Sequence, residues 1–202
     1  MKVSIDTIEI EIPEIYQKMK SLPDDPPDSA SYGMQNNNTM AMMLLFPIEP
    51  EQAMPLHAPQ IIIDSIRGFL KDNQGLIRVS AGKTRGGKKY VYSIVKSAKQ
   101  FFGVQYILTF QIQYPSKVLN IQAFYDEIGV TGLRDNIVYE IAEREGKVTL
   151  GSFDGWMNDP YDSNYKKGLR MNLSESEEYD KMFPNHPLSV LRRFIQAVEM
   201  YN

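Results

Sequence analysis

Strict alternation of apolar and polar residues over positions 104–125 constrains the fold of this chain more than any other feature. Every second residue of 104–114 is apolar or aromatic, and most of the positions between them hold Gln or Thr. After a turn that contains Pro115, the same alternation continues over residues 119–125. Because successive side chains of a strand point to opposite faces, this pattern predicts two antiparallel strands with one buried face.

Other segments supply further strands. The alternation over residues 3–12 changes face near Thr7, which indicates a bulged strand or two short strands. The acidic, proline-rich residues 21–29 predict a loop. Further strands are predicted over residues 39–46, where Pro47 should end the strand, over 76–80 and over 90–95.

Two segments have apolar residues at helical spacing, one at Ile62, Ile63, Ile66, Phe69 and Leu70, the other at Leu133, Ile137, Val138 and Ile141. Thr131 is expected to cap the second helix. Together these elements predict an α+β fold, an antiparallel β-sheet flanked by α-helices in an α/β/α sandwich. The side chains expected to face the helices are Tyr106, Leu108, Phe110 and Ile112.

The chain changes character after residue 150. Residues 151–187 are rich in Asp, Asn, Tyr, Gly and Pro and contain the single tryptophan, Trp156. Ser174 to Glu177 has the pattern of a capping box, and Pro187 should start a final helix. The apolar side expected for that helix contains Leu188, Leu191, Phe194, Ile195, Val198 and Tyr201, and we expect it to pack through Leu191, Phe194, Ile195 and Val198. We therefore expect an α+β domain over residues 1–150 and a docked, loop-rich helical extension over 151–202, with Trp156 substantially buried.

Composition excludes several kinds of site and of protein. The chain has no cysteine and two histidines, which excludes disulfides, thiolate nucleophiles and multi-histidine metal centres. The longest apolar run, residues 40–46, is too short to span a bilayer. The N-terminus lacks the apolar core of a signal peptide, which favours a cytoplasmic protein, although a mature domain cut from a secreted precursor would look the same.

Charge is distributed unevenly along the chain, although the net charge is only −3. No acidic residue lies between Asp72 and Asp126, and this basic block holds eight Lys or Arg residues: Arg78, Lys83, Arg85, Lys88, Lys89, Lys96, Lys99 and Lys117. Such a block either binds an acidic partner or pairs with the acidic ends of the chain. The candidate binding surface is the densest part of the block, Lys83, Arg85, Lys88 and Lys89.

The sequence Gly82-Lys83-Thr84 resembles the end of a phosphate-binding P-loop. The motif requires a glycine at the position of Ile77 and a following helix, whereas Gly86-Gly87 and a strand follow here. The tip of a hairpin is the better interpretation. Nucleic acid is a weaker alternative for the basic residues, because the chain as a whole is acidic.

No arrangement of residues indicates a catalytic, metal or cofactor site. Asp154, Asp159 and Asp162, with two asparagines nearby, offer oxygen ligands, but their spacing matches no calcium loop and suits turns equally well. Asp126 and Glu127 should point to opposite faces as exposed strand-end charges. Neither His57 nor His186 has an acid and a nucleophile arranged around it. We therefore predict no catalytic residue, no metal and no cofactor.

The order of these elements resembles the PsbP-like fold, which photosystem II extrinsic subunits share with a Ran-binding nuclear-import factor. The resemblance covers residues 1–150, and the segments that carry it are Ile8 to Pro13, Tyr90 to Val95, Tyr106 to Tyr114, Ile121 to Tyr125 and Leu133 to Ile141. It implies the fold and, in general, non-enzymatic binding, and it carries no functional residue over. The tail from Asp159 to Pro187 is similar to a segment of uncharacterised Gram-positive bacterial proteins.

Two functions remain open from the sequence. The first is a non-catalytic protein-binding or adaptor module, whose partner is another protein, possibly acidic. The second is a small-molecule-binding protein or metal-assisted enzyme with a site between the sheet and the C-terminal extension. An exposed apolar patch would favour the first function, and a deep pocket or clustered carboxylates would favour the second.

Overall fold

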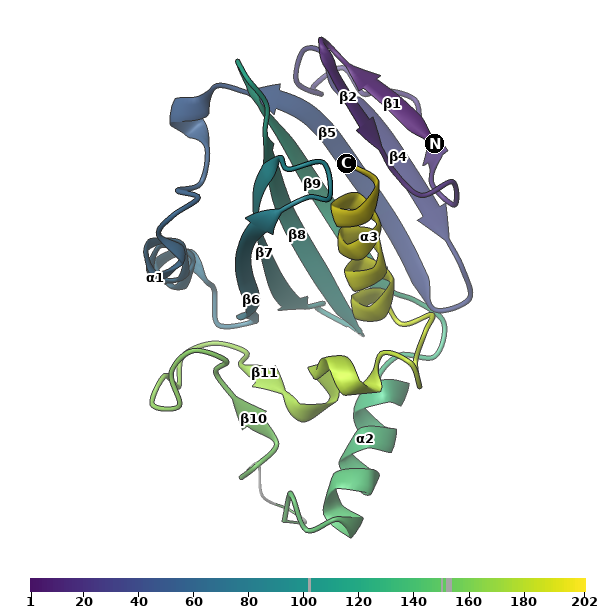
Figure 1. Ribbon diagram of the computed structural model, residues 1–202. Helices are drawn as coiled ribbons and strands as arrows, with labels where there is room; N and C mark the ends of the chain where they lie inside the picture. Colours follow the sequence, from purple (N-terminus) through teal and green to yellow (C-terminus); the bar gives the residue numbers. More distant parts are fainter. Residues whose placement is uncertain (102, 150, 152–153) are drawn as a thin grey trace.

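A seven-stranded antiparallel sheet forms the centre of the computed structural model, which describes residues 1–101, 103–149, 151 and 154–202 (Figure 1). Its strand order is β3-β4-β5-β9-β8-β7-β6. The strands are β3 (Gln17–Lys18), β4 (Ala30–Gln35), β5 (Thr39–Ile48), β6 (Gln74–Lys83), β7 (Lys89–Ala98), β8 (Val104–Gln113) and β9 (Val118–Glu127). The predicted α+β class, an antiparallel sheet flanked by helices, is confirmed.

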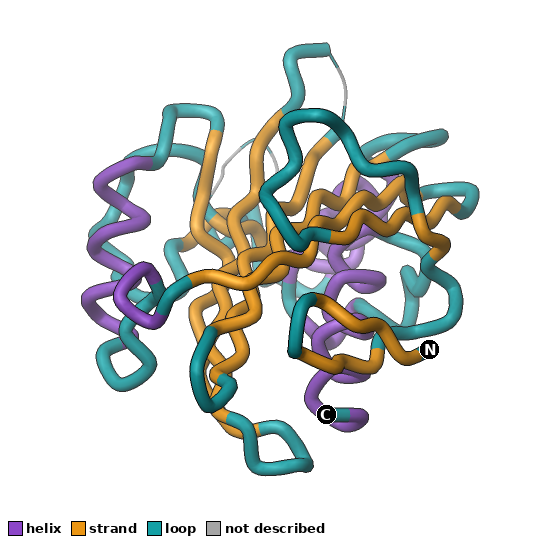
Figure 2. The backbone as a smooth tube through the Cα atoms, turned by 90° about the horizontal axis from the view of Figure 1, so that it is seen from above, coloured by secondary structure: helices purple, strands orange, loops and turns teal. Residues whose placement is uncertain are grey.

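A hairpin and the last helix cover the inner face of this sheet. Strands β1 (Lys2–Ile5) and β2 (Ile8–Glu11) pair with each other, and helix α3 (Pro187–Tyr201) lies beside them. Figure 2 shows the hairpin and α3 together on one side of the strands. The side chains of α3 belong to the same apolar cluster as those of the sheet. Burial of this shared face is the main source of stability, at roughly 25 cal/mol per Å² of apolar surface.

Two smaller clusters complete the molecule. Helix α1 (Pro59–Phe69) packs Ile62 and Ile63 on the outer face of β6 and β7. Helix α2 (Leu133–Arg144) packs on Trp156 and Tyr179, below the sheet in Figure 1. The segment between α2 and α3 contains the short pair β10 (Met157–Asn158) and β11 (Met171–Asn172) and two 3-10 turns, η2 (Leu173–Glu175) and η3 (Glu177–Tyr179). A further 3-10 turn, η1 (Pro50–Gln52), precedes α1.

Several predicted details are confirmed. The change of face near Thr7 marks two short strands that form a hairpin. The four residues expected to face the helices are at most 2% exposed: Tyr106, Leu108, Phe110 and Ile112. Trp156 is 7% exposed, and Leu188, Leu191, Phe194, Ile195 and Val198 are buried. Tyr201, predicted on the same side of the last helix, is 55% exposed at the end of α3.

Other details of the prediction are wrong, each for a physical reason. Strand β5 continues through Pro47, which pairs with Leu119 of β9. Pro47 lies beyond the end of β4, so no amide hydrogen bond to β4 is required at this position. Strand β4, which follows the predicted loop, was not expected at all. Phe69 lies on the solvent side of α1 and is 84% exposed.

The caps of two helical segments are also misplaced. Helix α2 begins after Gly132, not Thr131, and it buries Arg134, Val138 and Ala142 while Leu133 and Ile137 remain exposed. The capping box near residue 174 is formed by Asn172 and Glu175, two residues before the predicted pair. In both cases contacts with other elements decide which residues are buried and where the helical segment begins, and local spacing alone does not reveal them.

The segment after α2 lies against the open edge of the sheet at β6. The Leu169 amide donates to the Gln74 carbonyl at 2.8 Å, and the Tyr161 hydroxyl bonds to both backbone groups of Val79. A Cβ atom at Gly75 would lie 1.5 Å from the Leu169 carbonyl oxygen, so only glycine permits this approach. The predicted boundary at residue 150 lies outside the described residues, and the division into two parts stays a prediction.

Replacing Gly75→Ala should displace the segment that contains Leu169, because backbone atoms block the added methyl group. We expect lower stability to denaturant and faster protease cleavage within residues 154–172. Gly68→Ala is the matched control, since nothing lies within 4 Å of its Cβ position in α1. The control should be neutral or gain up to about 1 kcal/mol. Equal protease resistance of both variants would show that the segment does not depend on this contact.

Candidate functional site

The basic block divides into two groups in the structure. Four of its residues pair with carboxylates elsewhere in the chain: Arg78 with Glu177, Lys96 with Glu175, Lys99 with Asp126 and Lys117 with Asp6. The other four are the residues of the candidate surface, Lys83, Arg85, Lys88 and Lys89. Within the described part of the chain, none of these four forms an ion pair with a carboxylate. The interpretation as internal pairing therefore applies to half of the block only.

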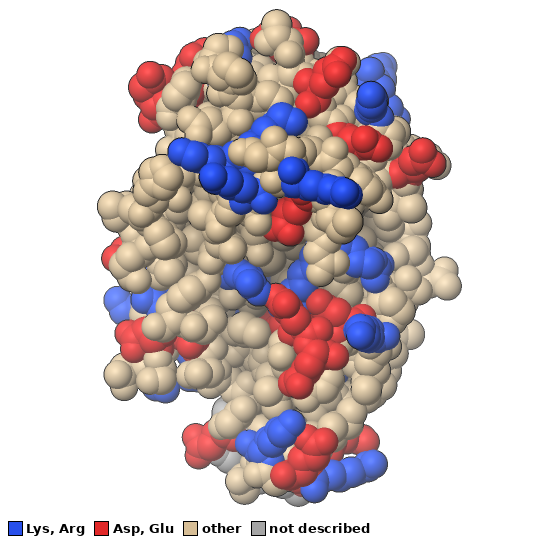
Figure 3. Space-filling model, viewed as in Figure 1, with Lys and Arg blue, Asp and Glu red and all other residues tan. Residues whose placement is uncertain are grey.

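The four cations lie at the tip of the β6–β7 hairpin. The turn closes through hydrogen bonds from the Thr84 amide to the Lys88 carbonyl and from the Gly87 amide to the Thr84 carbonyl, both at 2.9 Å. Gly87 has a φ of 83°, which a residue with a side chain rarely adopts. The structure therefore confirms that this segment is a hairpin tip and not a phosphate-binding loop. Figure 3 shows Lys and Arg side chains gathered in the region of this tip.

The end of α3 holds this tip in place. The Arg85 amide donates to the Glu199 carbonyl at 2.7 Å, and the Gly86 amide donates to the Asn202 carbonyl at 2.9 Å. The Tyr90 hydroxyl donates to the Glu199 carboxylate at 2.5 Å, and burial followed by this carboxylate raises the pKa of Tyr90. These bonds fix the backbone of the tip, and the side chains of Lys83, Arg85 and Lys89 remain exposed.

Lys83 and Lys89 stand directly opposite each other in the ladder between β6 and β7. Like charges in directly opposite positions destabilise a sheet. The Lys88 side chain lies on the inner face instead, with its ammonium group 5.2 Å from the centre of the Tyr114 ring. Burial raises the pKa of Tyr114 to about 12, so its hydroxyl stays protonated and donates to the Glu9 carbonyl. The tip thus concentrates positive charge, and none of its four cations forms an ion pair with a carboxylate of the described residues, although the Glu199 carboxylate lies beside Tyr90.

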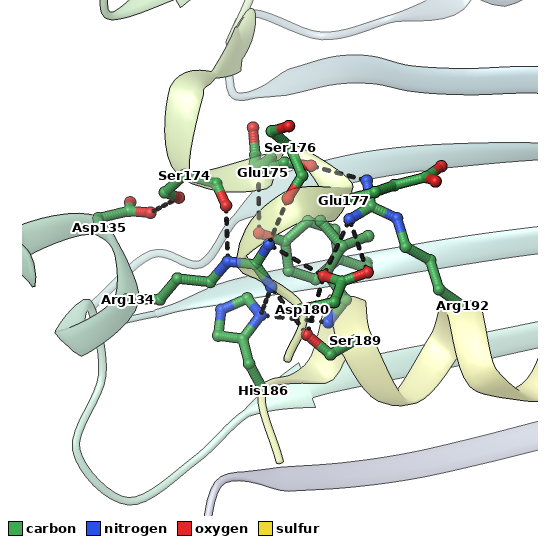
Figure 4. A network of polar contacts seen from close by, with 12 residues as sticks. Arg134, Asp135, Ser174, Glu175, Ser176, Glu177, Asp180, His186, Ser189 and Arg192 are labelled. Carbon is green, nitrogen blue, oxygen red and sulfur yellow. Dashed lines mark hydrogen bonds and ion pairs between the residues drawn. The ribbon is translucent and has the colours of Figure 1, made fainter. Parts of the chain in front are cut away.

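A second feature is a buried polar network between the sheet, α2 and α3 (Figure 4). The Arg134 side chain is 1% exposed. It donates to the carbonyls of Ser174 and Ser176, to the Asp180 carboxylate and to the Ser189 hydroxyl, at 2.7 to 3.0 Å. Its donors are therefore engaged within the protein, and the network ties α2 to α3.

Glu175 forms the other half of this network. Its carboxylate accepts from the Lys96 ammonium at 2.7 Å, from the Tyr106 hydroxyl at 2.9 Å and from the Asn172 amide at 2.7 Å. Lys96 and Tyr106 are directly opposite residues of β7 and β8, so two adjacent strands hold one carboxylate. Arg192 bonds to the Glu175 carbonyl and to both oxygens of Asp180. A buried pair of this kind loses about 3–5 kcal/mol when one partner is removed.

A pocket of about 270 Å³ borders the network at the end of the sheet, between Glu127, Leu133, Phe183 and His186. The Nδ1 atom of His186 accepts from the Leu188 amide and faces the Arg134 guanidinium, so the proton lies on Nε2. That atom is 3.9 Å from a Glu127 oxygen. The prediction that Asp126 and Glu127 are exposed is wrong for Glu127, which is 6% exposed and accepts from the Gly132 amide.

Burial determines the protonation of both groups in this pocket. It lowers the pKa of His186 to about 3, helped by the positive charges of Arg134 and Arg192. Burial also raises the pKa of Glu127. Sequence reasoning missed this pocket, because Glu127 and His186 are distant in the chain and only the docking of α3 brings them together.

The other sequence candidates have structural partners. Asp159 accepts from Arg67 and from the amides of Tyr161 and Asp162, which fixes the loop that it belongs to. No group of three or more His, Asp or Glu residues within the described ranges could hold a metal ion. His57 is exposed in the loop before α1. No helix among the described residues is long and apolar enough to cross a membrane.

The outer face of the sheet carries an exposed apolar patch. Met40 and Met42 of β5 are 37% and 45% exposed, and Phe124 of β9 is 37% exposed. Met42 and Phe124 are directly opposite each other in the ladder. Exposed apolar patches of this kind can mark an interaction surface.

No family model matches this sequence, and no curated protein matches it. Several solved structures match this chain in fold, among them the following two. The Ran-binding protein Mog1p of Saccharomyces cerevisiae has 12% identity and a TM-score of 0.40, over 73% of this chain and 82% of that chain. A point mutant of protein Mog1 has 11% identity and a TM-score of 0.41, over 69% and 82% of the two chains. Likeness at this level concerns the fold alone and assigns no partner.

The buried His186 predicts that stability falls in acid. The unfolded chain binds a proton near pH 6.5, whereas the folded protein resists protonation until about pH 3. Between these values stability should fall by up to about 1.4 kcal/mol per pH unit. The raised pKa of Glu127 acts in the opposite direction.

The variant His186→Asn keeps a side chain that can cap α3 and removes the titration. Between pH 7 and pH 5, urea unfolding of the original protein should lose about 2 kcal/mol more than unfolding of the variant. Parallel pH profiles of the two proteins would show that His186 is not held neutral.

Proposed function

We propose that this protein is a non-catalytic binding module that recognises an acidic protein partner through Lys83, Arg85, Lys88 and Lys89. The observation that carries this proposal is the register of the hairpin, which sets Lys83 opposite Lys89, with neither lysine in an ion pair with a carboxylate of the described residues. Such a pair costs stability in the free protein. An acidic ligand would remove this repulsion and so offset the cost in stability.

A protein partner fits this surface better than a nucleic acid. Proteins that bind single strands stack bases on exposed aromatic rings beside the basic residues. Tyr90 and Tyr92, which follow the tip, are 9% and 6% exposed and stack with Phe110 in the core. The aromatic residues that the sequence places beside the cations are therefore engaged inside the protein.

The pocket beside Glu127 and His186 corresponds in place to the alternative function, a site between the sheet and the C-terminal extension. Its volume of about 270 Å³ lies below the roughly 300–1,000 Å³ of typical ligand pockets. The Arg134 donors next to it are already engaged within the protein. A larger hollow of about 510 Å³ lies between β6 and the extension, but its charged residues Arg78 and Glu177 pair with each other. We therefore assign the function to the hairpin tip. We also propose that the protein is located in the bacterial cytoplasm.

The variant Lys83→Glu separates function from stability. It should weaken binding of a fluorescent oligo-glutamate peptide at least about tenfold, measured by anisotropy at low salt. It should also raise the free energy of unfolding by about 0.2–1 kcal/mol, because the new carboxylate faces Lys89. Lys167→Glu changes the net charge equally at an exposed position and should alter neither quantity.

Two results would contradict this proposal. A loss of stability in Lys83→Glu would give the lysine a structural role. Tighter binding of an oligothymidine of matched charge than of oligo-glutamate would point to a nucleic acid as the ligand.

A further inference from the structure

Strand β6 is an edge of the seven-stranded sheet and pairs with β7 only. An edge strand exposes backbone amides and carbonyls that can pair with another chain. Which groups are exposed follows from the ladder, where hydrogen-bonded and non-hydrogen-bonded residue pairs alternate. The Thr84 amide bonds to the Lys88 carbonyl, so the preceding pair, Lys83 with Lys89, is not hydrogen-bonded. The backbone groups of Lys83 therefore point away from β7.

The same alternation directs the backbone groups of Ala81 and Val79 outward. Val79 confirms this direction, because its amide and its carbonyl both bond to the Tyr161 hydroxyl, at 2.5 and 3.1 Å. At the other end, the outward amide of Arg85 bonds to the Glu199 carbonyl. The outward groups are thus occupied on both sides of a short stretch, residues 80–84.

Within this stretch the outward amides and carbonyls of Ala81 and Lys83 have no hydrogen-bond partner in the described part of the chain. Both residues are exposed. A hollow of about 260 Å³ lies beside them, bordered by Leu56 and His57 on one side and by Lys83 and Lys89 on the other. The open edge of β6, the hollow and the unpaired cations therefore lie at the same place on the protein surface.

We propose that the partner binds here as an extended acidic segment that adds to β6 as an eighth strand at Ala81 and Lys83. This inference rests on the proposed function and specifies the ligand. Side chains of an added strand alternate between the two faces of the sheet, so carboxylates at every second position would lie on the face of Lys83 and Lys89. Backbone bonding at a sheet edge is a known mode of peptide recognition.

Amide hydrogen exchange, followed by NMR, tests this proposal directly. The probe is a capped peptide of alternating Glu and Val, and the control peptide has Pro in place of Val, which keeps the charge and prevents strand pairing. At saturation with the first peptide, exchange at the Ala81 and Lys83 amides should slow at least about tenfold. The Gly82 amide, which faces β7, should be protected already in the free protein.

The variant Ala81→Pro provides a second test that keeps all four cations. Proline removes an outward amide without touching the bonds to β7, so the melting temperature should be retained. Its affinity for the Glu-Val peptide should fall at least about tenfold. Equal binding of both peptides, with unchanged exchange at Ala81 and Lys83, would overturn strand addition and leave recognition by charge in place. Binding of neither peptide would overturn both proposals.

Discussion

The packing of α3 on the inner face of the sheet is the interaction on which the rest of the structure depends. Leu188, Leu191 and Val198 have no exposed surface, and Phe194 meets Tyr16 edge to face at 5.4 Å. Each such side chain contributes roughly 1.5–3 kcal/mol by leaving water. The same helix carries Arg192 into the polar network at one end and Glu199 to the hairpin tip at the other.

This arrangement explains why half of the basic block is structural and half is free. Lys96 points to the inner face, where α3 and the preceding turn bring Glu175 within 2.7 Å. Lys83 and Lys89 point to the outer face beyond the end of α1, where no carboxylate of the described residues pairs with them. The charge pattern of the sequence is continuous, and only the folded sheet separates the cations that meet a carboxylate from those that do not.

The sequence was informative where a pattern is local and periodic. The alternation over residues 104–125 predicted both strands and their buried face, because a period of two requires no knowledge of the partner. It was uninformative where a distant contact decides the outcome. Arg134 is buried in a helix whose apolar residues Leu133 and Ile137 are exposed, because Asp180 and Ser174 arrive from another segment.

The candidate surface shows the same limit. The four cations could be picked out from their density, but their freedom from acidic partners depends on the register of β6 and β7 and on the bulge between Leu76 and Arg78. That bulge places Lys83 on the outer face, since one residue more or less reverses every side chain that follows. The outward backbone groups of Ala81 have no partner because Tyr161 bonds to Val79 and Glu199 bonds to Arg85, on either side of Ala81. No local sequence pattern reveals these two contacts.

The central claim is that the hairpin tip, and neither the pocket nor the apolar outer face, is where this protein meets its partner. A ¹H–¹⁵N NMR titration with an acidic peptide tests it most directly, because every amide reports at once. Shift changes should centre on residues 81–89 and weaken with added salt. Changes confined to Glu127 and His186, or to Met42 and Phe124, would contradict it.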